Sequence, residues 1–174
     1  MPASRDPRAS ALNLITPISS RGRMWLRFLF WAATVLPLPR FTVLRLRLIH
    51  YARWTVLGRS RPHLFFESNF NGTPDAYIEA FSYVFPKGMT AIWGSSQGFP
   101  GPVPVQSLQD WIGEGVVKSA HYYCAYPEAS TKEILAGLRV RDRLRDFNSR
   151  ARDMDASRFA DEYRALVSDL QLDI

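Results

Sequence analysis

Two neighbouring stretches of alternating polar and apolar residues constrain the fold more than any other feature of the sequence. Residues 42–57 (TVLRLRLIHYARWTVL) and 63–71 (HLFFESNFN) are rich in β-branched and aromatic residues, and the turn 58–62 (GRSRP) joins them. Side chains of a strand alternate between the two faces of its sheet, so this pattern predicts an antiparallel hairpin with a basic tip. An all-helical fold is therefore excluded.

Further elements are expected on both sides of the hairpin. A strand over 11–18 and a helix over 21–36, with Ser20 as its N-cap, precede it, and a helix opened by Thr73 and Pro74 follows it. We expect 89–94 (MTAIWG) to be the next strand, which gives the β-α-β-β-α-β order of a ferredoxin-like core with an antiparallel sheet. A helix over 105–117, a fifth strand over 120–126 (AHYYCAY) and helices over 131–150 and 157–170 complete an α+β prediction.

Length and composition predict one domain. A chain of 174 residues with 47% apolar residues can bury a substantial core. We expect residues 1–10 to be a flexible basic arm and residues 11–174 to be one ferredoxin-like domain with a helical extension from about residue 127. Cys124 is the only cysteine, and the three histidines do not follow zinc-ligand spacing, so no disulfide and no metal site are expected. These features favour the cytoplasm.

Positive charge is concentrated in the first third of the chain. Residues 1–62 contain eleven arginines and one acidic residue, Asp6, whereas the whole chain carries a net charge of only +6. Such a block attracts nucleic acid, an anionic membrane or an acidic partner, or it simply keeps apolar elements soluble. Nucleic acid is the weakest of these readings, because no Gly-aromatic strand motif is present and the arginines are dispersed.

The most apolar segment, residues 24–38, is too short to span a bilayer. It has 15 residues and contains Arg27, whereas a spanning helix needs about 20 residues. A secreted chain would have a small-residue cleavage site after its apolar segment, but here the segment runs into PLPRF (37–41). Two interpretations remain. The segment is a helix packed on the sheet alone, or it is a helix that also contacts a partner protein or a membrane surface. The second interpretation implies a protein bound peripherally to the inner membrane. The residues expected at that contact are Arg21, Arg23, Trp25, Arg27 and Trp31.

The predicted hairpin places a polar cluster on one face of the sheet. If Arg53 faces Glu67, then Tyr51, Arg53, Glu67 and Asn69 share the face away from the helices. An Arg-Glu pair could orient a ligand carboxylate or a water molecule, or it could be a structural ion pair at a dimer interface. Aromatic and imidazole side chains suit a flat ligand, so the candidate pocket also includes Trp93, His121 and Tyr123.

Several short segments resemble an uncharacterised bacterial family. They are 14–18 (LITPI), 49–54 (IHYARW), 67–72 (ESNFNG) and 98–100 (GFP). That family is similar to the dimeric α/β barrels, which include dye-decolorising peroxidases and antibiotic-biosynthesis monooxygenases. The resemblance implies a homodimer and oxidative chemistry. Asn71-Gly72 departs from the peroxidase motif, and no histidine after His121 could be a proximal haem ligand, so haem is not supported.

Two functions follow from these observations. The first is a non-catalytic binding or accessory module that self-associates, or docks on a larger and membrane-associated assembly, through its open sheet face and its basic aromatic first helix. The alternative is a small dimeric-barrel oxidative enzyme that acts on an aromatic ligand. The absence of a recognisable catalytic motif favours the first.

Overall fold

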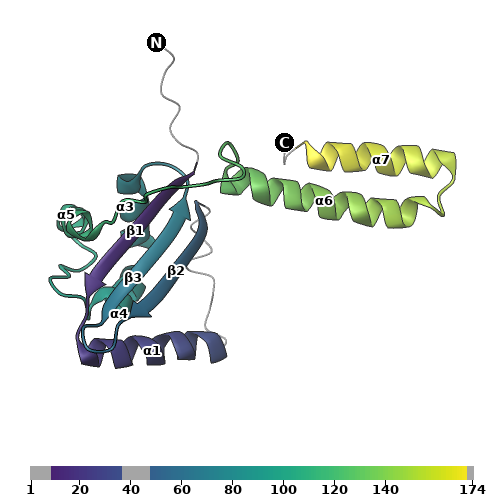
Figure 1. Cartoon of the computed structure of the whole chain (residues 1–174). Coiled ribbons are helices and arrows are strands. Elements are labelled where there is room, and N and C mark those ends of the chain that lie inside the picture. Colours follow the sequence, from purple (N-terminus) through teal and green to yellow (C-terminus); the bar gives the residue numbers. More distant parts are fainter. Residues whose placement is uncertain (1–8, 37–47, 172–174) are drawn as a thin grey trace, which may run out of the picture. The chain divides into compact units, whose positions relative to one another are not determined.

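The computed structural model describes residues 9–36 and 48–171 and has an α+β fold (Figure 1). Its three-stranded antiparallel sheet has the order β1-β3-β2. The elements are β1 (Ser10–Pro17), α1 (Ser20–Val35), β2 (Ile49–Leu57), β3 (His63–Phe70), α3 (Pro74–Val84), α4 (Pro86–Trp93), α5 (Val105–Gly115), α6 (Thr131–Ala151) and α7 (Ala156–Leu170). The chain divides into two compact units, Met1–Glu128 and Ala129–Ile174, and the second begins close to the expected start of the helical extension.

The predicted hairpin is formed by β2 and β3. They pair antiparallel with Arg53 opposite Glu67 and Trp54 opposite Phe66, in the predicted register. Gly58 turns the chain with φ +73, and a Cβ at this position would lie 2.7 Å from the carbonyl oxygen of Arg61, so glycine is required. Residues 42–47 of the first predicted strand, like most of the expected basic arm, lie outside the described residues.

Helix α1 begins one residue earlier than predicted. Its N-cap is Ser19 and not Ser20, because the extended backbone of Ser19 lets its Oγ accept a hydrogen bond from the Gly22 amide at 3.0 Å. Leu26 is fully buried in the core. A Cβ on Gly22 would lie 2.5 Å from the Cβ of Ser95, so the first turn of α1 packs directly against the residues after α4.

The predicted fourth strand is wrong, because residues 89–93 belong to helix α4. Pro86 occupies its first turn, and Met89, Ile92 and Trp93 are buried at the three- and four-residue spacing of a helix face. Two isolated bridges join β1 and the residue after it to the segments that follow α4 and α5. They pair Leu14 with Val116 and Ile18 with Ser96.

The predicted fifth strand, over 120–126, is also wrong. This segment has no regular secondary structure, and Tyr123 is 80% exposed, so its aromatic side chains do not alternate between a core and solvent. The segment is joined to the sheet just before it begins, where the Asn13 side chain donates to Ser119 Oγ at 2.7 Å. The structure therefore shows an α+β class but not the six-element ferredoxin-like order.

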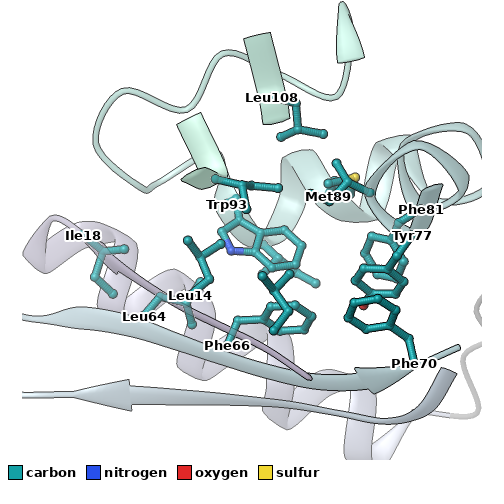
Figure 2. Packing of buried hydrophobic residues seen from close by; sticks show 14 of the residues in the cluster. Leu14, Ile18, Leu64, Phe66, Phe70, Tyr77, Phe81, Met89, Trp93 and Leu108 are labelled. Carbon is teal, nitrogen blue, oxygen red and sulfur yellow. The ribbon is translucent and has the colours of Figure 1, made fainter. Parts of the chain in front are cut away.

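The core of the first unit lies against one face of the sheet, where helices α3, α4 and α5 cover it (Figure 2), and Leu26 of α1 adds to it. Phe70 stacks on Tyr77 with ring centroids 4.0 Å apart, and Phe66 meets Trp93 edge to face at 5.1 Å. Aromatic pairs of this kind add to the stabilisation from buried apolar area. The buried side chains labelled in the figure are Leu14, Ile18, Leu64, Phe66, Phe70, Tyr77, Phe81, Met89, Trp93 and Leu108.

The second unit is a hairpin of the two helices α6 and α7, both of which were predicted. Ser130 and Glu133 form a capping box at the start of α6. Phe147 contacts the ring of Phe159 at a centroid distance of 5.3 Å, and Arg150 pairs with Glu162 at 2.7 Å across the two helices. This unit thus rests on one apolar seam flanked by ion pairs.

Candidate functional site

Three large aromatic side chains form an exposed row along α1. Trp25, Phe28 and Trp31 are 46%, 57% and 59% exposed, and successive ring centroids lie 6.2 and 6.0 Å apart. Their three-residue spacing places them on one side of the helix. Met24, Val35 and Leu36 are exposed on the same helix or at its end. We call Trp25, Phe28 and Trp31 the aromatic row.

The opposite side of α1 fixes the row in place. Leu26 and Ala32 are buried, and Phe30 packs against the ring of Trp54 with a centroid distance of 6.2 Å. The indole N–H of Trp25 donates to the Ala91 carbonyl at 2.7 Å, which holds this half-exposed ring against α4. The helix therefore has one face in the core and one apolar face in solvent.

Five arginines lie on α1 and on the β2–β3 turn. Arg21 and Arg27 are exposed on α1, and Arg23 donates through Nη1 to the Arg59 carbonyl at 3.2 Å. Arg59 and Arg61 are exposed on the β2–β3 turn. Helix α1 contains no acidic residue, and none of the five forms an ion pair within residues 9–36 and 48–171. This end of the unit is therefore strongly positive.

A groove of about 680 Å³ lies between α1 and the β2–β3 turn. Its walls are formed by Arg23, Met24, Arg27, Val56, Gly58 and Arg59. The antiparallel sheet brings the two segments together, because the Ile18 amide at the end of β1 donates to the Pro62 carbonyl at 3.0 Å. This neighbourhood was not predicted from the sequence, although the antiparallel pairing of β1 with β3 places the end of β1 beside the tip of the hairpin.

The open face of the sheet carries the polar cluster that was predicted there. The Tyr51 hydroxyl donates to Glu67 Oε1 at 2.7 Å, and the Arg53 guanidinium pairs with Glu67 Oε2. The hydrogen bond from Tyr51, together with Arg53, lowers the pKa of Glu67, and the same bond raises the pKa of Tyr51. Asn69 lies opposite Tyr51 on this face. Glu67 is thus a carboxylate with both oxygens engaged.

Of the other residues in the predicted pocket, Trp93 does not join this cluster. Trp93 is 3% exposed and lies in the core, on the opposite face of the sheet, while His121 and Tyr123 are exposed in the irregular segment after α5. Tyr122, from the same segment, interacts electrostatically with Tyr51. Glu67 is the main cause of the raised pKa of Tyr51, and Tyr122 contributes the least. The structure therefore assembles the first four predicted residues and places Trp93 apart from them.

Among the described residues, no three His, Cys, Asp or Glu side chains are grouped as a metal site would require. No helix in the described parts of the chain combines the length and the apolar character that a membrane span needs. The groove and the aromatic row remain the strongest candidate site.

Comparison with known proteins found no matching protein-family model, curated protein or solved structure. The resemblance to the dimeric α/β barrels therefore stays a prediction.

Proposed function

We propose that this protein is a non-catalytic accessory module that binds the surface of an anionic membrane through α1. The observation that carries the proposal is the exposed aromatic row beside arginines that have no carboxylate partner among the described residues. Indole and phenyl rings are stable at the depth of lipid headgroups, and arginines are attracted by the negative surface potential of anionic lipids.

The chemistry favours reversible attachment over insertion. A basic residue close to an anionic surface contributes about 1 kcal/mol, and each partly buried aromatic ring adds the free energy of the apolar area that leaves water. Five arginines and three rings on one end of the unit are enough for peripheral binding. Attachment at the inner membrane is the location that this proposal implies.

Self-association or docking through the open sheet face is the second part of the proposal. Tyr51 is 43% exposed and Arg53 is mostly exposed on this face, while Phe65 and Ile15 are half-buried beside them. A surface that mixes aromatic and charged groups in this way is typical of protein interfaces. The chain order β1-α1-β2-β3-α3 supports a relation to ferredoxin-like dimeric barrels over that part of the protein.

An oxidative enzyme acting on an aromatic ligand is the weaker proposal. It needs Trp93 and Tyr51 in one pocket wall, whereas these residues lie on opposite faces of the sheet. It also needs a reactive or orienting group, and Glu67 is already engaged by Tyr51 and Arg53. These contacts favour a structural role for the cluster.

Flotation with vesicles tests membrane binding. We expect the wild-type chain to float with phosphatidylcholine vesicles that contain phosphatidylglycerol and to stay in the dense fraction with phosphatidylcholine alone. The variant F28S/W31S should lose flotation, because it removes two exposed rings without touching the core. The control variant Y83S/Y126S removes two aromatic rings that are 67% and 75% exposed elsewhere in the same unit, and it should float like the wild type. Wild-type protein that never floats would refute the proposal.

A further inference from the structure

The groove beside the aromatic row has the charge of an anion site. Arg23 and Arg27 contribute to its α1 wall, and Arg59 contributes to the wall formed by the turn. Three like charges around one space repel one another, and no carboxylate among the described residues offsets them. An anion in the groove would remove this repulsion.

The guanidinium groups are available for hydrogen bonding. Arg23 uses one of its N–H donors on the Arg59 carbonyl, which holds the two walls together. Its other donors, and the side chains of Arg27 and Arg59, have no hydrogen-bond acceptor among the described residues. A guanidinium presents N–H groups in a fork that matches two oxygens of a phosphate. Gly58 has no side chain to fill the groove wall formed by the turn, and its positive φ would strain any other residue at this position.

The remaining walls indicate where the rest of the ligand would lie. Met24 and Val56 make part of the lining apolar. Met24 and Phe28 are four residues apart on α1, as are Arg27 and Trp31, so the groove adjoins the aromatic row. A ligand with an anionic head and an apolar body matches this arrangement, and the row would contact the same lipid layer.

We infer that the groove binds the terminal phosphate of phosphatidic acid in the membrane. The inference rests on the proposed function. Three arginines suit a phosphomonoester, whose second negative charge and three free oxygens accept more hydrogen bonds than the singly charged diester of phosphatidylglycerol.

Vesicles of matched surface potential separate this site from general charge attraction. One set contains phosphatidic acid and the other contains enough phosphatidylglycerol to give the same zeta potential, both in phosphatidylcholine. We expect the wild type to bind the phosphatidic acid vesicles about tenfold more tightly, because the groove adds charge-assisted hydrogen bonds to the diffuse attraction. Equal binding of both sets by the wild type would overturn the inference.

A variant in the groove and a matched control locate the effect. The variant R27Q/R59Q removes two groove charges and leaves the Arg23 contact with the Arg59 backbone in place. The control R145Q/R152Q removes two exposed arginines of the second unit that form no ion pair with another described residue. We expect the groove variant to lose the preference for phosphatidic acid and the control to keep it. Unchanged preference in the groove variant would overturn the inference.

Two further outcomes distinguish the causes of failure. Wild-type protein that binds neither set of vesicles refutes the proposed function itself, whereas equal binding of both sets refutes only the phosphate site. Calorimetric titration with sn-glycerol 3-phosphate tests a soluble source of the same group. We expect at least about a hundredfold weaker binding than to the vesicles, because the soluble ligand lacks the membrane contacts of the aromatic row. Equal affinity would assign the groove to a free phosphomonoester instead.

Discussion

The two units differ in how they bury apolar side chains. In the first unit, the sheet and helices α1, α3, α4 and α5 contribute to a core in which Leu64 and Phe70 have no solvent exposure. In the second unit, Phe147 and Leu170 are the buried apolar side chains of its described residues. Seven large apolar side chains of that unit stay exposed, namely Ile134, Leu135, Leu138, Leu144, Phe159, Tyr163 and Val167. Two helices meet along one seam, so most of their surface remains in solvent.

The same observation therefore has a different meaning in each unit. Exposed apolar side chains on α6 and α7 are the ordinary result of a two-helix hairpin. The aromatic row on α1 belongs to a unit whose other described phenylalanine and tryptophan rings are buried or half-buried, and whose other exposed aromatic rings are tyrosines with a polar hydroxyl group. The exposure of the row therefore needs another explanation. This contrast is the reason to place the function on α1 and not on the second unit.

The largest expected effect is the loss of the core ring in Phe70→Ala. Phe70 is fully buried and stacked on Tyr77, so we expect the free energy of unfolding of the first unit to fall by about 3–5 kcal/mol. All five tryptophans lie in this unit, so denaturation followed by tryptophan fluorescence reports on it alone. Hydrogen exchange in α6 and α7 should not change. Equal loss of protection in both units would show that they unfold together.

A smaller effect is expected for Phe147→Ala. This ring joins α6 to Phe159 and Tyr163, but its surroundings are open, so we expect about 2 kcal/mol of lost stability, confined to the second unit. Hydrogen exchange in α6 and α7 should accelerate while the tryptophan fluorescence transition stays in place. The control Leu144→Ala removes a side chain that is already 42% exposed and should cost clearly less. Equal costs would mean that the hairpin has no effective core.

Helix caps give a matched comparison between the units. Thr73 Oγ1 accepts from the Ala76 amide at 3.3 Å, and Ser130 Oγ accepts from the Glu133 amide at 3.2 Å. Each change to alanine should cost about 1 kcal/mol. Because the core of the first unit unfolds cooperatively, Thr73→Ala should lower the free energy of global unfolding of that unit. Ser130→Ala should only increase hydrogen exchange in the first turn of α6. The exposed Ser168→Ala in α7 is the control and should not destabilise.

The smallest effect concerns the open sheet face. Because the hydrogen bond from Tyr51 and the charge of Arg53 lower the pKa of Glu67, the ionised group stabilises the folded state above the ordinary glutamate pKa. This contribution disappears as the pH falls through the lowered pKa. The pair is largely exposed, so the expected effect is only about 0.2–1 kcal/mol. Melting temperatures measured from neutral to acidic pH should fall more for the wild type than for Glu67→Gln, and parallel curves would contradict this assignment.

Much of the fold could be predicted where the pattern was long. The alternation over 63–70 gave the register of β3, and the Thr73-Pro74 pair gave the start of α3. Residues 89–94 were too short to separate a strand from a helix by apolar content alone, although Pro86 and the spacing of Met89, Ile92 and Trp93 favoured a helix. The aromatic residues of 120–126 have strand propensity but no buried face, and tertiary context overrides propensity in such a segment.

The candidate site was predictable only in part. Register placed Arg53 opposite Glu67, and helical spacing grouped Trp25 with Trp31. Trp93 was misplaced because its element was misassigned. The meeting of Arg23 with Arg59 depends on contacts between segments 36 residues apart, and no local pattern specifies them.

The short bridges along β1 also determine how this sheet can grow. The Asn13 carbonyl already accepts from the Val117 amide at 2.9 Å, and the Pro17 carbonyl accepts from the Gln97 amide at 2.9 Å. An unprotected edge strand offers free backbone groups to any extended chain, which is a common route to aggregation. A strand from another molecule could add along β1 only after these bonds break. The segments that follow α4 and α5 thus cap the β1 edge, and a continuous intermolecular sheet would need both edges to be free.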